Sequence, residues 1–212
     1  KTNRGIIQSG NVVSSHWNAR LEHQLGSFKI ELLEAHAAHI MQDSGKLAAL
    51  TSACLVTEMA LPERHPYPKL FAALHAFIKL LNTEHDWQIA YIKYELTLLA
   101  ESGFGLDLSE CAATGKTNDL MYVSPKSGRA VSRDAGLPYH DKLLALPTFL
   151  TGSRIQDSGS KKQITEAPPP KLEAQNILAG MKLTGYFLEH SLFEPHGKTL
   201  PACRARLYNL IP

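Results

Sequence analysis

Residues 86–103 read DWQIAYIKYELTLLAESG, and their hydrophobic side chains recur at helical spacing. Asp86 can cap this helix at its start, and Gly103 can end it. Two preceding segments have the same period, one between Asp43 and Pro62 and one that begins at Pro68. Three helices of this length with short connections indicate a helical bundle.

The first 31 residues have a pattern that is typical of strands. Residues 11–19 mix β-branched and aromatic side chains, and residues 27–32 alternate apolar with charged ones. Two strands alone do not form a stable sheet, so this piece needs partners. We therefore expect that earlier strands are missing from the start of the chain.

A hairpin is expected between residues 119 and 133. Cys111 and Thr114 precede it, and Ser132 and Ala135 lie at its end, which is the spacing of the four ligands of a zinc ribbon. Only one of the four positions carries a thiol, and a single thiolate cannot hold structural zinc. The sequence thus predicts a degenerate zinc ribbon that keeps its frame without metal.

Composition and charge narrow the class of protein. The 212 residues are 44% hydrophobic, which suits a globular chain, and no uncharged apolar stretch is long enough to cross a membrane. Three scattered cysteines suit a reducing cytoplasm. The net charge of +2 is uneven, with −5 in residues 32–115 and +5 (13 basic against 8 acidic side chains) in residues 116–212. This asymmetry indicates either contact of particular surfaces with a polyanion or an ordinary solvated surface.

The chain has no enzyme signature. Gly115-Lys116-Thr117 lacks the upstream glycine of a phosphate-binding loop, because Glu110 stands there. His36 and His39 share a helical face, but we find no carboxylate or cysteine spaced to complete a metal site with them. We interpret both as exposed histidines, and we expect neither catalysis nor a cofactor.

One stretch, YELTLLAESGFGLDLSEC at residues 94–111, resembles the signature of the RecO family of bacterial recombination mediators, in wording that looks alphaproteobacterial. The resemblance continues in YVSPKSGRA at 122–130, QSGN at 8–11 and LPACRAR at 200–206. It implies an α+β protein with an N-terminal OB-fold, a helical bundle and a zinc ribbon inserted in the bundle.

On this template the chain divides into two parts. Residues 1–31 are assigned to the C-terminal strands of an OB-fold whose earlier strands are missing. Residues 32–212 are assigned to the helical bundle, which is mainly α-helical and carries the ribbon-like insert at 108–138.

The resemblance also implies a function without turnover. Such proteins bind single- and double-stranded DNA, anneal complementary strands and, with RecR, help RecA displace single-strand binding protein, in the bacterial cytoplasm at the nucleoid. OB-folds bind strands through a basic groove with stacking aromatics. The candidate DNA-binding residues here are Lys1, Arg4, Trp17, Arg20 and Lys29. Trp17 or Phe28 could stack on bases. Trp17 is equally consistent with a core role, and for Phe28 the core role is the favoured interpretation.

Two more surfaces are implied. Lys93 and Leu96 match the positions where relatives take the acidic, apolar C-terminal tail of single-strand binding protein, although Lys93 is equally consistent with a solvated helix residue. Ile92 stands where some relatives have a second basic residue, so we expect a weaker contact. A further set could touch DNA backbone or RecR: Arg129, Arg133, Arg204 and Arg206.

The competing hypothesis is a docking module that binds RecR or the tail of single-strand binding protein but no DNA.

Overall fold

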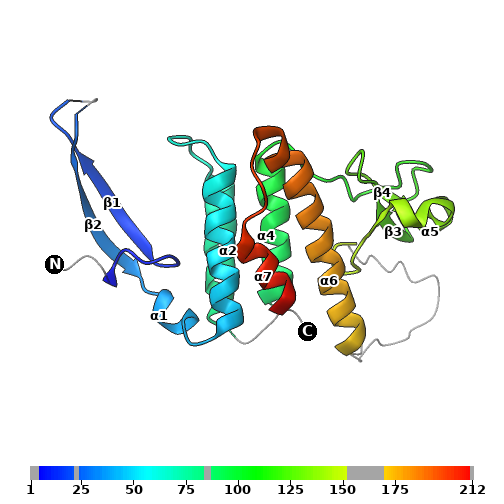
Figure 1. Ribbon diagram of the computed structural model, residues 1–212, viewed down its shortest axis with the longest axis horizontal. Helices are drawn as coiled ribbons and strands as arrows, with labels where there is room; N and C mark the ends of the chain where they lie inside the picture. Colours follow the sequence, from blue (N-terminus) through cyan, green and yellow to red (C-terminus); the bar gives the residue numbers. More distant parts are fainter. Residues whose placement is uncertain (1–4, 22–23, 84–86, 152–169, 211–212) are drawn as a thin grey trace.

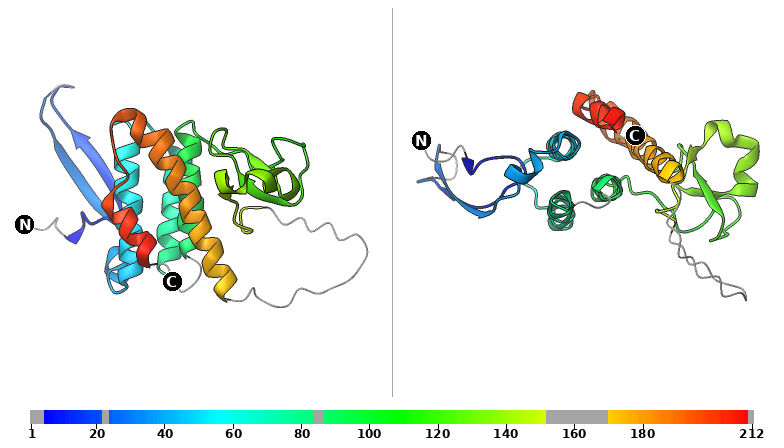
Figure 2. Two further views of the ribbon diagram at one scale, coloured as in Figure 1. Left: turned by 45° about the vertical axis from the view of Figure 1, so that its right-hand side comes forward. Right: turned by 90° about the horizontal axis from the view of Figure 1, so that it is seen from below.

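The computed structural model describes residues 5–21, 24–83, 87–151 and 170–210. Within these ranges the helices lie between two small antiparallel sheets (Figure 1). The two sheets stand at opposite ends of the molecule, as the view from below also shows (Figure 2). The protein is thus of mixed α and β structure, as expected. Lys1, Arg4 and Asp86 lie outside the described residues.

The first sheet is a hairpin of β1 (Val12–Asn18) and β2 (Ser27–Glu34). The two strands pair antiparallel, with Trp17 opposite Phe28 and a register shift between Val12 and Val13. Strand β2 continues to Glu34, three residues beyond the expected boundary between the two parts of the chain. The assignment of this hairpin to an OB-fold stays a prediction.

The helices begin where local signals place them. Helix α1 (Ala37–Ile40) is short, and α2 (Ser44–Ala60) starts where the Asp43 side chain accepts hydrogen bonds from the N–H groups of Gly45 and Lys46, at 2.8 and 3.0 Å. Helix α3 (Pro68–Leu81) has its proline in the first turn, and α4 (Trp87–Glu101) follows.

The C-terminal part completes the helical layer. Helix α6 (Pro170–Phe187) runs into a π-helical turn, η3 (Leu188–Phe193), and a 3-10 turn, η4 (Glu194–His196). The chain then returns as α7 (Ala202–Leu210). No helix in the described part of the chain is both long and apolar enough to span a membrane.

Two buried tyrosines of α4 lie at the centre of the core. The ring of Phe77 stacks on Tyr94, with ring centroids 5.9 Å apart, and meets Tyr91 edge-on. The Tyr91 hydroxyl hydrogen-bonds with Ser52 Oγ at 2.7 Å, and the Tyr94 hydroxyl with Thr57. Each buried hydroxyl therefore has the partner that burial requires.

The second sheet contains the predicted hairpin, β3 (Leu120–Val123) and β4 (Ala130–Ser132). A third strand, β5 (Leu144–Ala145), joins the free edge of β3 and gives the order β4-β3-β5. The short helix α5 (Arg133–Gly136) and the 3-10 helix η2 (Leu137–Lys142) connect β4 to β5. Strand β5 was not expected from the sequence.

Candidate nucleic-acid interface

An exposed aromatic pair lies near the outer end of the β1–β2 hairpin. Directly opposed residues of an antiparallel pair share a face, so Trp17 and Phe28 meet, with ring centroids 4.7 Å apart. Trp17 is 49% exposed and Phe28 59% exposed. No element in the described ranges covers that face, so Phe28 is exposed here, and its interpretation as a core residue stays a prediction.

Gly26 leaves room for the indole of Trp17. A Cβ at residue 26 would lie 2.4 Å from the Asn18 carbonyl oxygen and 2.6 Å from Trp17 Cζ2. A residue without a side chain is thus required where the chain turns back under the indole.

One predicted cation of the hairpin, Lys29, does not share the face of the aromatic pair. Side chains alternate along a strand, so Lys29, opposite His16, projects from the other face of the hairpin. Lys29 Nζ also lies 3.0 Å from Glu31 Oε1, in an exposed ion pair. Arg20 is exposed just beyond the end of β1.

Lys93 and Leu96 lie on α4, as the sequence indicated. Lys93 is exposed, and Leu96 is half-buried against the core. Ile92 is fully buried and packs toward α6, because a Cβ at Gly180 would lie 2.7 Å from Ile92 Cδ1. Position 92 therefore belongs to a helix–helix contact and adds nothing to the surface around Lys93.

Arg204 is not a surface residue, and its assignment to a DNA or RecR contact is wrong. Only 4% of Arg204 is exposed, and it forms an ion pair with the fully buried Glu95. The guanidinium also donates to the Met181 carbonyl at 2.6 Å and to Thr184 Oγ1 at 3.0 Å. All of its charge is thus directed into the interface of α4, α6 and α7.

The other three predicted arginines remain accessible but are dispersed. Arg129 pairs with Asp107 and Glu110 at 3.4 and 3.1 Å, and Arg133 pairs with Asp119 at 3.2 Å. Arg206 is exposed on α7. Figure 1 shows α7 among the helices, whereas Arg129 and Arg133 belong to the β3–β4 region at the far end from the β1–β2 hairpin. These side chains do not form one basic surface.

The four ribbon positions do not fit a zinc ion. Cys111 is buried, and the Ser132 backbone N–H donates to its sulfur at 3.2 Å. Thr114, Ser132 and Ala135 supply no thiolate or imidazole, so this donor set lacks what structural zinc requires. Burial of the Cys111 thiol opposes ionisation, but hydrogen bonds from Ser132, Thr114 and Ala113 lower its pKa to about 6.

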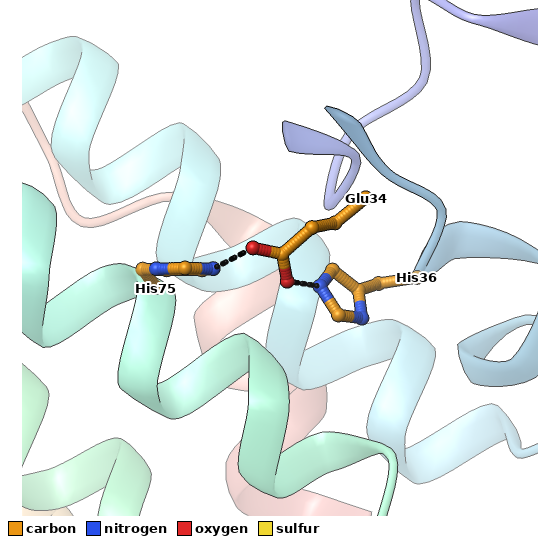
Figure 3. A group of neighbouring side chains, drawn as sticks. All are labelled: Glu34, His36 and His75. Carbon is orange, nitrogen blue, oxygen red and sulfur yellow. Dashed lines mark hydrogen bonds and ion pairs between the residues drawn. The ribbon is translucent and has the colours of Figure 1, made fainter. Parts of the chain in front are cut away.

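Glu34, His36 and His75 form a cluster that was not expected from the sequence. Figure 3 shows both imidazoles directed at the Glu34 carboxylate, with His36 from the segment between β2 and α1 and His75 from α3. His39, the partner considered for His36, is exposed on α1. Glu34 and His36 are two residues apart, and this spacing was a usable signal for a shared site. The expectation that no carboxylate is spaced to complete a metal site with His36 was therefore wrong. His75 is too distant in the sequence to have been found.

Comparison with known proteins gives one family. The family model "Recombination protein O C terminal" matches residues 41–200. The chain is 45% identical over 205 residues to the DNA repair protein RecO of Rhodospirillum centenum, covering 96% of this chain and 75% of that protein. It is 43% identical over 208 residues to that of Rhodospirillum rubrum (96% and 77%) and 43% identical over 199 residues to that of Caulobacter vibrioides (94% and 76%).

A family model that covers most of the chain and identities above 40% place this mixed α and β protein in a family of DNA repair proteins. The chain belongs to the RecO family, and these relatives are alphaproteobacterial, as the resemblance implied.

Proposed function

We propose that this protein is a DNA repair and recombination mediator that works without turnover. It binds single- and double-stranded DNA and anneals complementary strands. With RecR it helps to load RecA onto DNA coated with single-strand binding protein, in the bacterial cytoplasm. Family membership supports the repair role, and the exposed Trp17–Phe28 pair is the observation that carries strand binding.

The aromatic pair has the properties of a stacking platform for single strands. Its rings are half exposed, and it lies near the turn of the hairpin, at the end that extends away from the helices (Figure 1). A base stacked on an aromatic side chain contributes ~1–3 kcal/mol to binding. Arg20, exposed just after β1, is the described cation best placed in the chain to meet the phosphates of a strand stacked there.

Binding of a labelled single-stranded oligonucleotide, followed by fluorescence anisotropy, tests this proposal. Trp17→Ala and Phe28→Ala should each weaken binding about 5- to 100-fold, the equivalent of one lost stacking contact. Phe71→Ala is the matched control, because Phe71 is an equally exposed aromatic on α3. Wild-type affinity in both hairpin variants would contradict the proposal.

Salt dependence separates the role of charge from that of stacking. Arg20→Ala should reduce the slope of log affinity against log salt by about one, because one phosphate contact is lost. The two aromatic variants should leave that slope unchanged. A slope near zero for the wild type would favour the docking module instead.

A second surface supports docking of an acidic tail. A pocket of about 350 Å³ between β5 and α6 is mostly apolar and has Lys182 in its lining. A cation beside an apolar wall suits a terminal carboxylate preceded by an apolar side chain. This pocket and the Lys93–Leu96 surface are thus two candidate binding sites for the tail of single-strand binding protein.

Charge reversal distinguishes the two candidate sites. We propose that Lys93 and Leu96 form the binding site. With a peptide of the tail as probe, Lys93→Glu should then abolish peptide binding, and Lys182→Glu should leave peptide binding unchanged. The opposite result would place the tail in the pocket at β5 and α6. Tail binding without any strand binding would identify the protein as a docking module.

A further inference from the structure

Glu34, His36 and His75 come together where the β1–β2 hairpin joins the helices (Figure 3). Glu34 Oε2 lies 3.0 Å from His36 Nε2, and Glu34 Oε1 lies 3.2 Å from His75 Nε2. All three ligand atoms lie within 4.8 Å of one another. Glu34 ends β2 and His36 follows two residues later, whereas His75 lies in the middle of α3, so the fold brings His75 to the other two.

His36 is held in place from three directions. Its backbone N–H donates to Asn11 Oδ1 at 3.0 Å, and its ring nitrogen Nδ1 lies 2.7 Å from Asn82 Nδ2. Asn82 Nδ2 also donates to the Ile78 carbonyl at 3.3 Å, which fixes the side of the amide that faces the ring. Nδ1 is therefore the acceptor, and Nε2 carries the proton toward Glu34.

The buried ring nitrogen Nε2 of His75 lacks a good hydrogen bond among the described residues. Despite the 3.2 Å separation from Glu34, this nitrogen has no well-directed hydrogen bond to any residue that the structure describes. A buried ring nitrogen without a good partner is costly, and an additional ligand at this position would satisfy it.

We propose that Glu34, His36 and His75 bind one divalent transition-metal ion, with Zn²⁺ as the best match. Two imidazoles and one carboxylate with an open fourth position form an established donor set for zinc, and the ligands of a tetrahedral ion at about 2.0–2.1 Å lie roughly 3.3 Å apart. The present spacing of at most 4.8 Å requires only small side-chain movements to reach that arrangement.

The bound ion would fasten the hairpin to the bundle. Glu34 and His36 belong to the segment that leaves β2, and His75 belongs to α3. Because a metal that binds only the folded arrangement stabilises it, the ion would limit the movement of the hairpin relative to the helices. This inference does not depend on whether the hairpin binds DNA.

Two neighbours determine how tightly the ion binds. Lys79 Nζ lies 3.5 Å from Glu34 Oε2 and competes as a cation, but its side chain is exposed and free to swing away. Asn82 must turn its carbonyl oxygen toward His36 Nδ1 when Nε2 binds metal, since Nδ1 then carries the proton. Lys79→Met should tighten binding several-fold, and Asn82→Ala should weaken it about tenfold.

Competition between the full-length protein and a chromogenic chelator for Zn²⁺ tests the site. We expect one ion per chain, at least tenfold weaker binding in His36→Ala and His75→Ala, and no change in the matched control His39→Ala, an exposed histidine on α1. Co²⁺ bound to the site should show visible d–d absorption without the sulfur-to-metal charge-transfer band that Cys111 would produce.

Thermal unfolding gives a second measurement in case a histidine variant folds poorly. Zn²⁺ should raise the midpoint of the wild type and of His39→Ala but not that of the milder variant His75→Gln. Absence of a one-to-one complex in the wild type, or Zn²⁺ binding that survives in both His36→Ala and His75→Ala, would overturn the proposal.

Discussion

Arg204 on α7 forms two parallel hydrogen bonds with Glu95 on α4: Nε donates to Oε1 at 3.1 Å and Nη2 to Oε2 at 2.9 Å. Both side chains are buried, and the hydroxyl of Thr184 on α6 donates to the same carboxylate. Glu95 belongs to the 94–111 stretch and Arg204 to the 200–206 stretch, so two of the segments that resemble RecO meet in one structural contact. This ion pair joins three helices and leaves no charge for a ligand.

Removal of one partner of the ion pair should strongly lower the free energy of unfolding. Arg204→Ala leaves the Glu95 carboxylate buried without its counter-charge, and we expect a loss of about 3–5 kcal/mol in the free energy of unfolding, measured with urea. Arg206→Ala, two residues along α7 and exposed, is the control and should change it by less than about 0.5 kcal/mol. Similar effects of the two variants would contradict this role for Arg204.

The double variant Glu95→Leu, Arg204→Met should be more stable than either single variant. It removes both charges and refills the volume with apolar atoms, which often restores the stability that one unpaired charge removes. Additive losses in the double variant would instead show that the two side chains act independently.

Gly185 provides the space for the Arg204 guanidinium. A Cβ at residue 185 would lie 2.9 Å from Arg204 Nη1, so Gly185→Ala should displace the guanidinium from Glu95 at a cost of about 1–3 kcal/mol. In an Arg204→Met background the same substitution should cost less, because the clashing group is gone. Chemical denaturation of the four proteins measures the difference, and an equal cost in both backgrounds would contradict the assignment.

The buried tyrosines should make the fold labile at alkaline pH. Burial raises the pKa of Tyr94 from its ordinary value of 10.0 to about 12, with hydrogen bonding to Thr57 opposing, and burial also raises that of Tyr91. Between these values the unfolded chain loses the Tyr94 proton while the folded chain keeps it, so stability falls as pH rises from 10 toward 12. We expect Tyr94→Phe to reduce this fall by up to about 3 kcal/mol.

Urea unfolding as a function of pH measures that fall, with Tyr139→Phe as the control because Tyr139 is exposed on the surface. Tyr94→Phe should also lower stability at neutral pH, since the Tyr94–Thr57 hydrogen bond is lost, although the Thr57 hydroxyl still donates to the Ala53 carbonyl. An identical alkaline fall in the wild type and in Tyr94→Phe would refute the assignment.

Local signals in the sequence were sufficient for much of the fold. Asp43 marked the start of α2, Pro68 that of α3, and the turn at residues 125–128 marked the β3–β4 hairpin. Each of these signals acts within a few residues of its own position, so the sequence alone reveals it. The two residues of β5, Leu144 and Ala145, carry no such signal, because their strand forms only by pairing with the edge of β3.

Long-range contacts explain the errors at the site. Arg204 sits in a short polar helix, and nothing nearby in the sequence shows that Glu95, 109 residues away, pairs with it. The cluster of Glu34 and His36 is completed by His75 on another helix for the same reason. Phe28 alternates as a core residue should, and its face of the hairpin is uncovered within the described residues, so its role as a core residue stays a prediction.

We propose that the aromatic pair of the hairpin engages single strands. The most direct measurement is the annealing of complementary oligonucleotides coated with single-strand binding protein, with the wild type compared to the double variant Trp17→Ala, Phe28→Ala and to the control Phe71→Ala. We expect annealing by the wild type and the control and its loss in the double variant, while that variant stays folded. Annealing at the wild-type rate by the folded double variant would rule out this role for the aromatic pair.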